Sequence, residues 1–282
     1  MTYTRFAAMI ATSTVVMFGL MYLNTYALGH VFFSETRLYM ALLMGAVMAV
    51  IMMGFMWAMY EGRMVKLGIF AGAAVAIALS LWLVRSQATV GGLSYMRAMI
   101  PHHSIAVMTS GRADIEDARV RKLADGIIAA QRREIAEMRW LVAELEAGRV
   151  VESAYADPPP VAGSAEDALN TLRLSTLYPA PLTAAEAARL VDGPTGGCNF
   201  RQTKADAPIL WTNAKGDTAA MLLNGTYLSL SGGEGRFADG RIAAEVTPLD
   251  DEAAGLRSDA ALVFSIAQGP TRGYRGFWSC AQ

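Results

Sequence analysis

The sequence predicts a membrane-anchored protein of several domains: three transmembrane α-helices, an exported α-helical hairpin and a small C-terminal antiparallel β domain with a disulfide. Three observations predict this organisation. Long uncharged apolar runs fill the first 85 residues, a helical pattern with clustered methionine and histidine follows, and short β-type runs lie between the two cysteines. The predicted boundaries are 1–85 for the anchor, 86–147 for the hairpin, 148–193 for a linker with short helices, and 194–282 for the β domain.

The anchor is predicted from three runs that carry no charged side chain, residues 6–28, 38–60 and 67–84. A helix needs about 20 apolar residues, with a range of roughly 17 to 25, to cross a bilayer. We interpret the first run as a retained helix, because its apolar core is too long for a signal peptide and no small-residue cleavage site precedes the second run. The lipid bilayer is therefore the first predicted partner.

The cations in the loops predict the orientation of the anchor. Arg5, Arg63 and Lys66 flank one side of the predicted spans, and Arg37 and Arg85 flank the other. Cations gather on the cytoplasmic side, so this bias favours a cytoplasmic N-terminus. Three spans then place the rest of the chain outside, where a cysteine pair is expected to persist as a disulfide. We expect a bacterial inner-membrane protein with periplasmic C-terminal domains.

Some functions are not expected. The formal net charge of −1 offers no electrostatic basis for binding nucleic acid. The sequence contains no nucleophile–base constellation and no Gly-rich phosphate loop, so an enzyme is not expected either.

The C-terminal part predicts short strands that alternate with turns. Residues 148–182 are rich in Ala and Pro and predict a linker with a short helix around 165–173. Thr183 and Glu186 have the spacing of a capping box, which predicts that another short helix begins there. From Cys198 onward we expect five or six antiparallel strands, with a hairpin at Asn224–Gly225. A bridge between Cys198 and Cys280 would close this module near both ends.

Methionine and histidine side chains cluster in the stretch YMRAMIPHHSIAVM, residues 95–108. At about 100° per residue, four of them fall within an arc of roughly 120° on an ideal helix: Met96, Met99, His102 and His103. Met108 falls on the opposite side, although a kink at Pro101 would change relative positions across it. Four donors on one helix face form an arrangement that a metal ion can use.

The second helix of the hairpin is expected to begin near Asp114 as its N-cap. Its apolar stripe comprises Val120, Leu123, Ile127, Met138, Leu141 and Leu145, widened by Ile128 and Ile135. Gln131 and Glu134 interrupt this stripe, and Glu134 and Met138 share a face. A hairpin with two apolar stripes cannot enclose a core alone. We expect it to form a homodimeric four-helix bundle, or to lie against its own β module or linker.

The donor types favour copper. Thioether sulfur suits Cu(I), and imidazole suits copper as well as zinc. Zinc usually binds thiolate, imidazole or carboxylate, and di-iron bundles need Glu-x-x-His pairs, which this sequence lacks. The alternative is packing, because methionine commonly fills gaps in helical cores. The adjacent histidine pair argues against that alternative.

The stretches MIPHHSIAVM (99–108) and IIAAQRREIAEM (127–138) resemble the domain-of-unknown-function 305 family. This resemblance covers about residues 93–145 and implies a ferritin-like helical core. It also implies a periplasmic copper-binding role, which is discussed for some members. Carried over position by position, it implies metal contacts from Met99, His102, His103 and Met108, faced by Gln131, Glu134 and Met138. The β module resembles small envelope domains of the lysozyme-inhibitor type, but we favour a disulfide-stapled binding or spacer module.

One further pattern lies in the second apolar run, where Met40, Met44, Met48, Met52 and Met56 recur every fourth residue. A Cu(I) path is one interpretation, but such a ladder spirals around the helix and an apolar packing surface explains it equally well. We interpret His30 as an interfacial residue. Two functions remain: an envelope protein that sequesters or relays Cu(I), or a membrane-bound structural or interaction protein whose β module binds an envelope partner.

Overall fold

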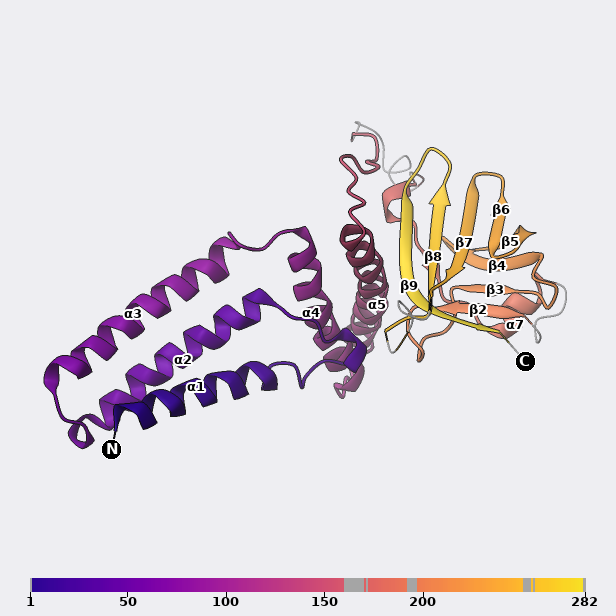
Figure 1. The fold of residues 1–282 in the computed structure, drawn as a ribbon. Helices are drawn as coiled ribbons and strands as arrows, with labels where there is room; N and C mark the ends of the chain where they lie inside the picture. Colours follow the sequence, from indigo (N-terminus) through magenta and orange to yellow (C-terminus); the bar gives the residue numbers. More distant parts are fainter. Residues whose placement is uncertain are drawn as a thin grey trace. The chain divides into compact units, whose positions relative to one another are not determined.

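The computed structural model describes residues 2–159, 170, 172–191, 197–250, 255 and 257–280 (Figure 1). The chain divides into two compact units, residues 1–125 and 126–282. This division falls within one long helix, so the predicted domain boundaries stay a prediction. Each unit is described by itself below.

The first unit contains three helices that are long and apolar enough to cross a membrane, as the sequence predicts. These are α1 (Tyr3–Leu20), α2 (Glu35–Phe55) and α3 (Arg63–Ser86). Helix α3 contains its whole predicted apolar run, whereas α1 and α2 end at Leu20 and Phe55, before their runs do. The Ser34 hydroxyl accepts a hydrogen bond from the Arg37 backbone N–H and caps α2 before its apolar part begins. Two 3₁₀ turns, η1 (Leu28–His30) and η2 (Trp57–Met59), lie in the connections.

Two more helices follow, α4 (Gly92–Arg112) and α5 (Ala118–Glu146). The prediction that the second of these begins near Asp114 is wrong by one turn. The Asp117 carboxylate accepts hydrogen bonds from the backbone N–H groups of Arg119 (2.8 Å) and Val120 (3.3 Å), so Asp117 is the N-cap. Hydrogen bonds from the Arg119 side chain, and then from these backbone groups, lower the pKa of Asp117 to about 2.

The second unit is built on a closed antiparallel barrel. Its eight strands are β2 (Cys198–Arg201), β3 (Leu210–Thr212), β4 (Thr218–Leu223), β5 (Thr226–Gly233), β6 (Arg236–Asp239), β7 (Ile242–Pro248), β8 (Ala260–Ile266) and β9 (Thr271–Cys280). Each strand pairs with its neighbours in sequence, and β9 pairs with β2, which closes an up-and-down barrel (Figure 1). The prediction of five or six strands is wrong, because β2 and β6 have only four residues each and lack an apolar run.

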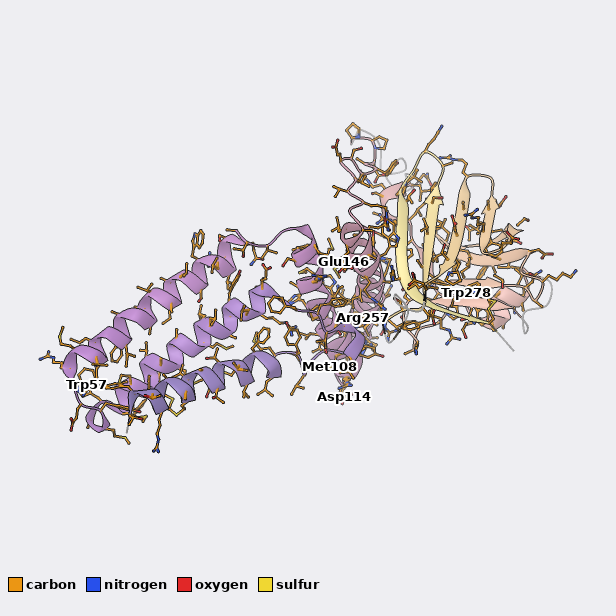
Figure 2. The ribbon with its side chains drawn as sticks, in the orientation of Figure 1. Trp57, Met108, Asp114, Glu146, Arg257 and Trp278 are labelled. Carbon is orange, nitrogen blue, oxygen red and sulfur yellow. A yellow bond between two sulfur atoms is a disulfide. The ribbon has the colours of Figure 1, made fainter. Side chains whose placement is uncertain are left out.

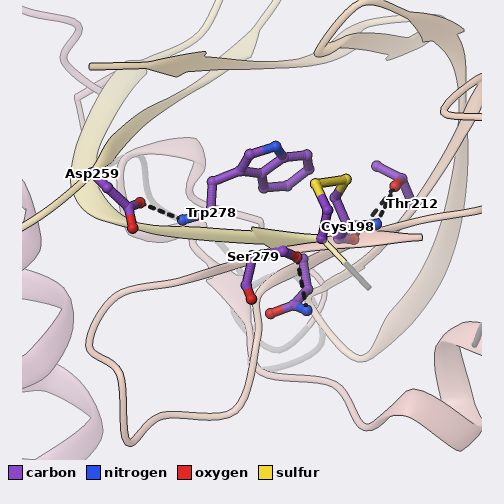
Figure 3. Close-up of a disulfide and its surroundings, with 7 residues drawn as sticks. Cys198, Thr212, Asp259, Trp278 and Ser279 are labelled. Carbon is purple, nitrogen blue, oxygen red and sulfur yellow. Dashed lines mark hydrogen bonds between the residues drawn. A yellow bond between two sulfur atoms is a disulfide. The ribbon is translucent and has the colours of Figure 1, made fainter. Parts of the chain in front are cut away.

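The predicted hairpin and disulfide are confirmed. Asn224 and Gly225 join β4 to β5 with φ values of 49° and 74°, the left-handed pair that a two-residue hairpin turn requires. Cys198 and Cys280 are directly opposite each other in β2 and β9, and their sulfur atoms are bonded. The bridge therefore lies on the seam that closes the barrel (Figure 3).

Further hydrogen bonds cross or flank this seam (Figure 3). The Asn199 side-chain amide donates to the Ser279 carbonyl at 3.2 Å, and the Trp278 N–H donates to Asp259 at 2.7 Å. Inside the barrel the core contains large side chains with no exposed surface, including Phe200, Leu210, Met221, Leu230, Leu262, Phe264 and Tyr274. An eight-stranded barrel is just wide enough for side chains to fill it.

Part of the predicted linker packs on the barrel. It forms η3 (Leu174–Thr176), the two-residue strand β1 (Pro179–Ala180), which pairs with β4, and α7 (Ala184–Ala188). The predicted capping box is confirmed, since Thr183 and Glu186 bond each other's backbone. The helix predicted around 165–173 falls almost entirely outside the described residues.

Candidate metal centre

Helix α4 carries the five predicted ligands of the first unit and continues through Pro101. A continuous helix keeps Met96, Met99, His102 and His103 on one arc of roughly 120°. His102 is exposed, and the other three are half-buried. The two imidazole rings have centroids 6.2 Å apart. Helix geometry therefore gathers four of the five donors on one side of α4.

Met108 belongs to the other side of α4. It is nine residues beyond Met99, which corresponds to about two and a half turns and hence to a direction about 180° away. The sequence left this position open because of Pro101, but the helix is unbroken. Met108 lies near the C-terminal end of α4 (Figure 2).

The buried face of α4 is formed by Ile100, Ser104 and Val107. It rests on α2 and on the η1 turn. The predicted donors Met96, Met99, His102 and His103 are between about 80° and 160° from Ser104 around the helix, so they lie outside this face. The donor arc of α4 is therefore separate from the face that packs on α2 and η1.

Ser104 holds the loop between α1 and α2 against α4. Its hydroxyl oxygen accepts a hydrogen bond from the Tyr26 N–H at 2.8 Å and lies 2.9 Å from Nδ1 of His30. The Ser104 hydroxyl can donate to His30 Nδ1 or accept from it, according to the tautomer of the imidazole. His30, which we interpreted as an interfacial residue, is a buried packing residue with 4% exposure. Sequence reasoning missed this contact.

The other three predicted ligands belong to α5 in the second unit. The Gln131 side-chain amide donates to a Glu134 carboxylate oxygen at 3.3 Å, and both side chains are half-buried. Met138 is buried, with 8% exposure. Gln131 and Glu134 are thus hydrogen-bonded to each other, and Met138 lies about one turn further along α5.

The barrel packs on a different face of α5. Arg132 forms an ion pair with Asp206 at 2.8 Å, and Glu137 forms one with Arg272 of β9 at 3.0 Å. Ala136 is part of the barrel core. At about 100° per residue, Gln131, Glu134 and Met138 point roughly 140° to 160° away from Ala136. The predicted ligands therefore lie on the side of α5 opposite to the side that packs on the barrel.

Aromatic contacts strengthen the attachment of α5. The Tyr178 ring lies between two guanidinium groups, with Arg133 3.8 Å and Arg272 4.3 Å from its centroid. The Trp140 indole covers Gly273 of β9 so closely that a Cβ atom there would lie 2.1 Å from the ring. Glycine at this position is what allows the helix to approach the strand.

We predict that Gly273→Ala lowers the free energy of unfolding of the second unit by about 1–3 kcal/mol, because the added methyl group overlaps the indole. In a Trp140→Ala background the same substitution should cost clearly less, since the overlap is gone. Chemical denaturation of the four proteins of this double-mutant cycle measures the difference. Equal costs in both backgrounds would show that the two residues do not meet.

The methionine ladder of α2 is partly engaged in packing. Met53 has no exposed surface and lies in a cluster with Phe6 and Tyr60. Met52 and Met56 pack against the same cluster. This end of the ladder therefore has a structural explanation in apolar packing, as is common for methionine in helical cores.

Within the described residues, no group of three or more His, Cys, Asp or Glu side chains is placed to hold a metal ion. The predicted centre is of a different kind, because thioethers supply half of the donors on the α4 arc. A soft ion such as Cu(I) fits that donor set, and a carboxylate-seeking ion does not.

Two protein-family models match the chain, one over the segment that begins with α4 and one over the barrel. Residues 92–188 match the family described as Domain of unknown function (DUF305). This match covers 97 of the 282 residues. The resemblance read from the sequence is thereby confirmed, and the DUF305 segment begins at the first residue of α4 and contains all eight predicted ligands.

The barrel has a family match of its own, which sequence reasoning missed. Residues 143–282 match Domain of unknown function (DUF6692), overlapping the DUF305 segment at 143–188. A curated relative is the uncharacterized protein L153 of Acanthamoeba polyphaga mimivirus, 36% identical over 70 residues. That alignment covers 24% of this chain and 46% of the relative, so it spans about half of that protein's length. No solved structure matches the chain.

Proposed function

We propose that the chain is a membrane-anchored envelope protein that sequesters or relays Cu(I). The observation that supports this most is the donor arc of α4: Met96, Met99, His102 and His103 on one side of an unbroken helix, outside its packing face. Gln131, Glu134 and Met138 of α5 are proposed as further donors. All of them belong to the DUF305 segment.

The chemistry of the arc suits an ion that must be held and released. Thioethers are neutral and soft, so they bind Cu(I) without first losing a proton. His102 is exposed and provides an accessible first contact for the incoming ion, whereas the half-buried Met96, Met99 and His103 hold it more deeply. Copper is thus the cargo of the protein in this proposal.

The test is competition for Cu(I) between the purified full-length protein and a chromogenic chelator. The full chain is needed because α4 rests on α2 and on the η1 loop through Ser104, contacts that a fragment starting at residue 86 would lose. Uptake of copper by the wild-type protein is the expected result. If the folded protein takes up none, the alternative of a membrane-bound structural or interaction protein replaces this proposal.

We propose an N-terminus in the cytoplasm and C-terminal domains in the periplasm, on the basis of the loop cations and the disulfide. An alkaline phosphatase fusion after Gln282 should be active, because that enzyme needs an oxidising compartment. A fusion after Glu61, between α2 and α3, is the control and should be inactive. The reverse pattern would reject this orientation and, with it, the compartment of the copper site.

Homodimer formation through the hairpin stays a prediction. Val120 and Leu123 of α5 are 51% and 66% exposed, so this end of the predicted stripe is available for a partner.

A further inference from the structure

The second unit contains a buried arginine for which the structure provides no counter-charge. Arg139 of α5 is 6% exposed, and its Nη2 atom is fully buried. Within the described part of the chain, this Nη2 atom has no hydrogen-bond partner. Burying a cation without a partner is costly, so such a group calls for an explanation.

Two more arginines lie close to Arg139. The indole of its neighbour Trp140 covers Gly273, and Arg275 is two residues further along β9, on the same face of that strand. Arg257 lies three residues before the first residue of β8 (Figure 2). Burial, followed by the repulsion of Arg257 and Arg275, lowers the pKa of Arg139 to about 10. Arg257 and Arg275 are thus both near enough to Arg139 to repel its charge.

The nearby carboxylates act on Arg275 rather than on Arg139. Asp250, Glu144 and Glu146 all attract Arg275. Glu144 is itself bound by Arg149, which donates to both of its oxygens at 2.7 Å. None of these carboxylates is among the groups that influence Arg139, whose named neighbours are both cations. Arg275 is therefore partly balanced by carboxylates, whereas the groups named as acting on Arg139 are both cations.

We propose that Arg139, together with Arg257 and Arg275, binds a phosphate group. Guanidinium groups bind phosphate oxygens through paired N–H donors, and several of them around one doubly charged anion offset their mutual repulsion. The barrel interior is already filled by side chains, so this site lies where α5 meets the outside of β9. It is independent of the copper proposal, since it shares no residue with the donor arc.

The experiment measures thermal stability and calorimetric binding of the full-length protein with inorganic phosphate as the probe. Phosphate should raise the Tm of the wild type, because a ligand of the folded state stabilises it. Arg139→Gln should weaken binding about tenfold or more, as expected for the loss of charge-assisted hydrogen bonds. Arg236→Gln is the matched control, since Arg236 is an exposed arginine of β6 paired with Glu245.

A second set of measurements separates free phosphate from a lipid headgroup. Wild type and Arg139→Gln are compared in nanodiscs of zwitterionic and of anionic phospholipid. A free ligand predicts the same phosphate response in both lipids, whereas a lipid headgroup predicts a higher starting Tm in the anionic discs that phosphate does not raise further. If Arg139→Gln does not fold, Arg275→Gln takes its place. A wild-type Tm that responds to neither phosphate nor anionic lipid, or responds equally in the variants, overturns the proposal.

Discussion

Replacing His102 and His103 together by alanine is expected to weaken Cu(I) binding at least tenfold at pH 7 (about 1.4 kcal/mol or more) and to change it little near pH 4. An imidazole binds a metal ion only in its neutral form, and the ordinary pKa of a histidine side chain is about 6.5. As the pH falls below that value, protons displace the metal from imidazole. The histidine contribution should therefore be present at neutral pH and absent in acid, where only thioethers still bind.

Met99→Ile separates ligation from packing, because isoleucine keeps the apolar bulk and loses the sulfur. It should weaken Cu(I) binding at both pH values, since a thioether has no proton to exchange. Met108→Ile is the matched control: the same change on the same unbroken helix, about 180° away from Met99. We expect it to leave binding nearly unchanged.

If Met99 only packs, both methionine variants should bind copper like the wild type. Each would then cost at most about 1.5 kcal/mol of stability, as near-isosteric core changes usually do. Competition against a chromogenic Cu(I) chelator at pH 7 and pH 4, on the full-length protein, distinguishes the two outcomes. Equal competition by the wild type and all three variants would mean that the cluster is not a copper site.

The parts of the fold that could be predicted are those encoded locally. Uncharged apolar runs are long enough to identify α1, α2 and α3 without knowing their neighbours. The Thr183–Glu186 capping box and the Asn224–Gly225 turn are interactions between residues at most three apart, and both were predicted correctly. The same reasoning placed the donor arc of α4, since the arc depends only on helix periodicity.

The parts that could not be predicted depend on contacts between distant residues. Barrel closure depends on the β2–β9 pairing. Strand β2 is only four residues long and has no alternating apolar pattern by which the sequence could identify it. The contact between Ser104 and His30 joins positions 74 residues apart.

The contacts of the polar face of α5 also could not be predicted. Arg and Glu are residue types that are mostly exposed in proteins. In the structure, Arg132, Glu137 and Trp140 each contact the barrel or its loops. Composition alone cannot separate a solvated face from one that forms ion pairs with another element, because the partners Asp206 and Arg272 are distant in sequence.

Removing the bridge with Cys198→Ala and Cys280→Ala should have the largest effect on the stability of the second unit. The two cysteines are 82 residues apart, and in the chain-entropy model a closed loop of that size contributes about 4.5 kcal/mol. Among the described strands of the barrel, the bridge also lies on the one pairing that joins strands distant in sequence, β2 and β9. Without it, the unfolded chain gains freedom and the seam must close by hydrogen bonds alone.

Denaturant unfolding followed by tryptophan fluorescence measures this cost, because Trp140, Trp211 and Trp278 all report on the second unit. The reduced wild-type protein is the control and should unfold at the same denaturant concentration as the double variant. Thiol labelling of the unreduced, denatured wild type should find no free thiol. A stability loss below about 1 kcal/mol would show that the β2–β9 seam is held by its other contacts, such as the Asn199–Ser279 hydrogen bond, and that the covalent closure adds little.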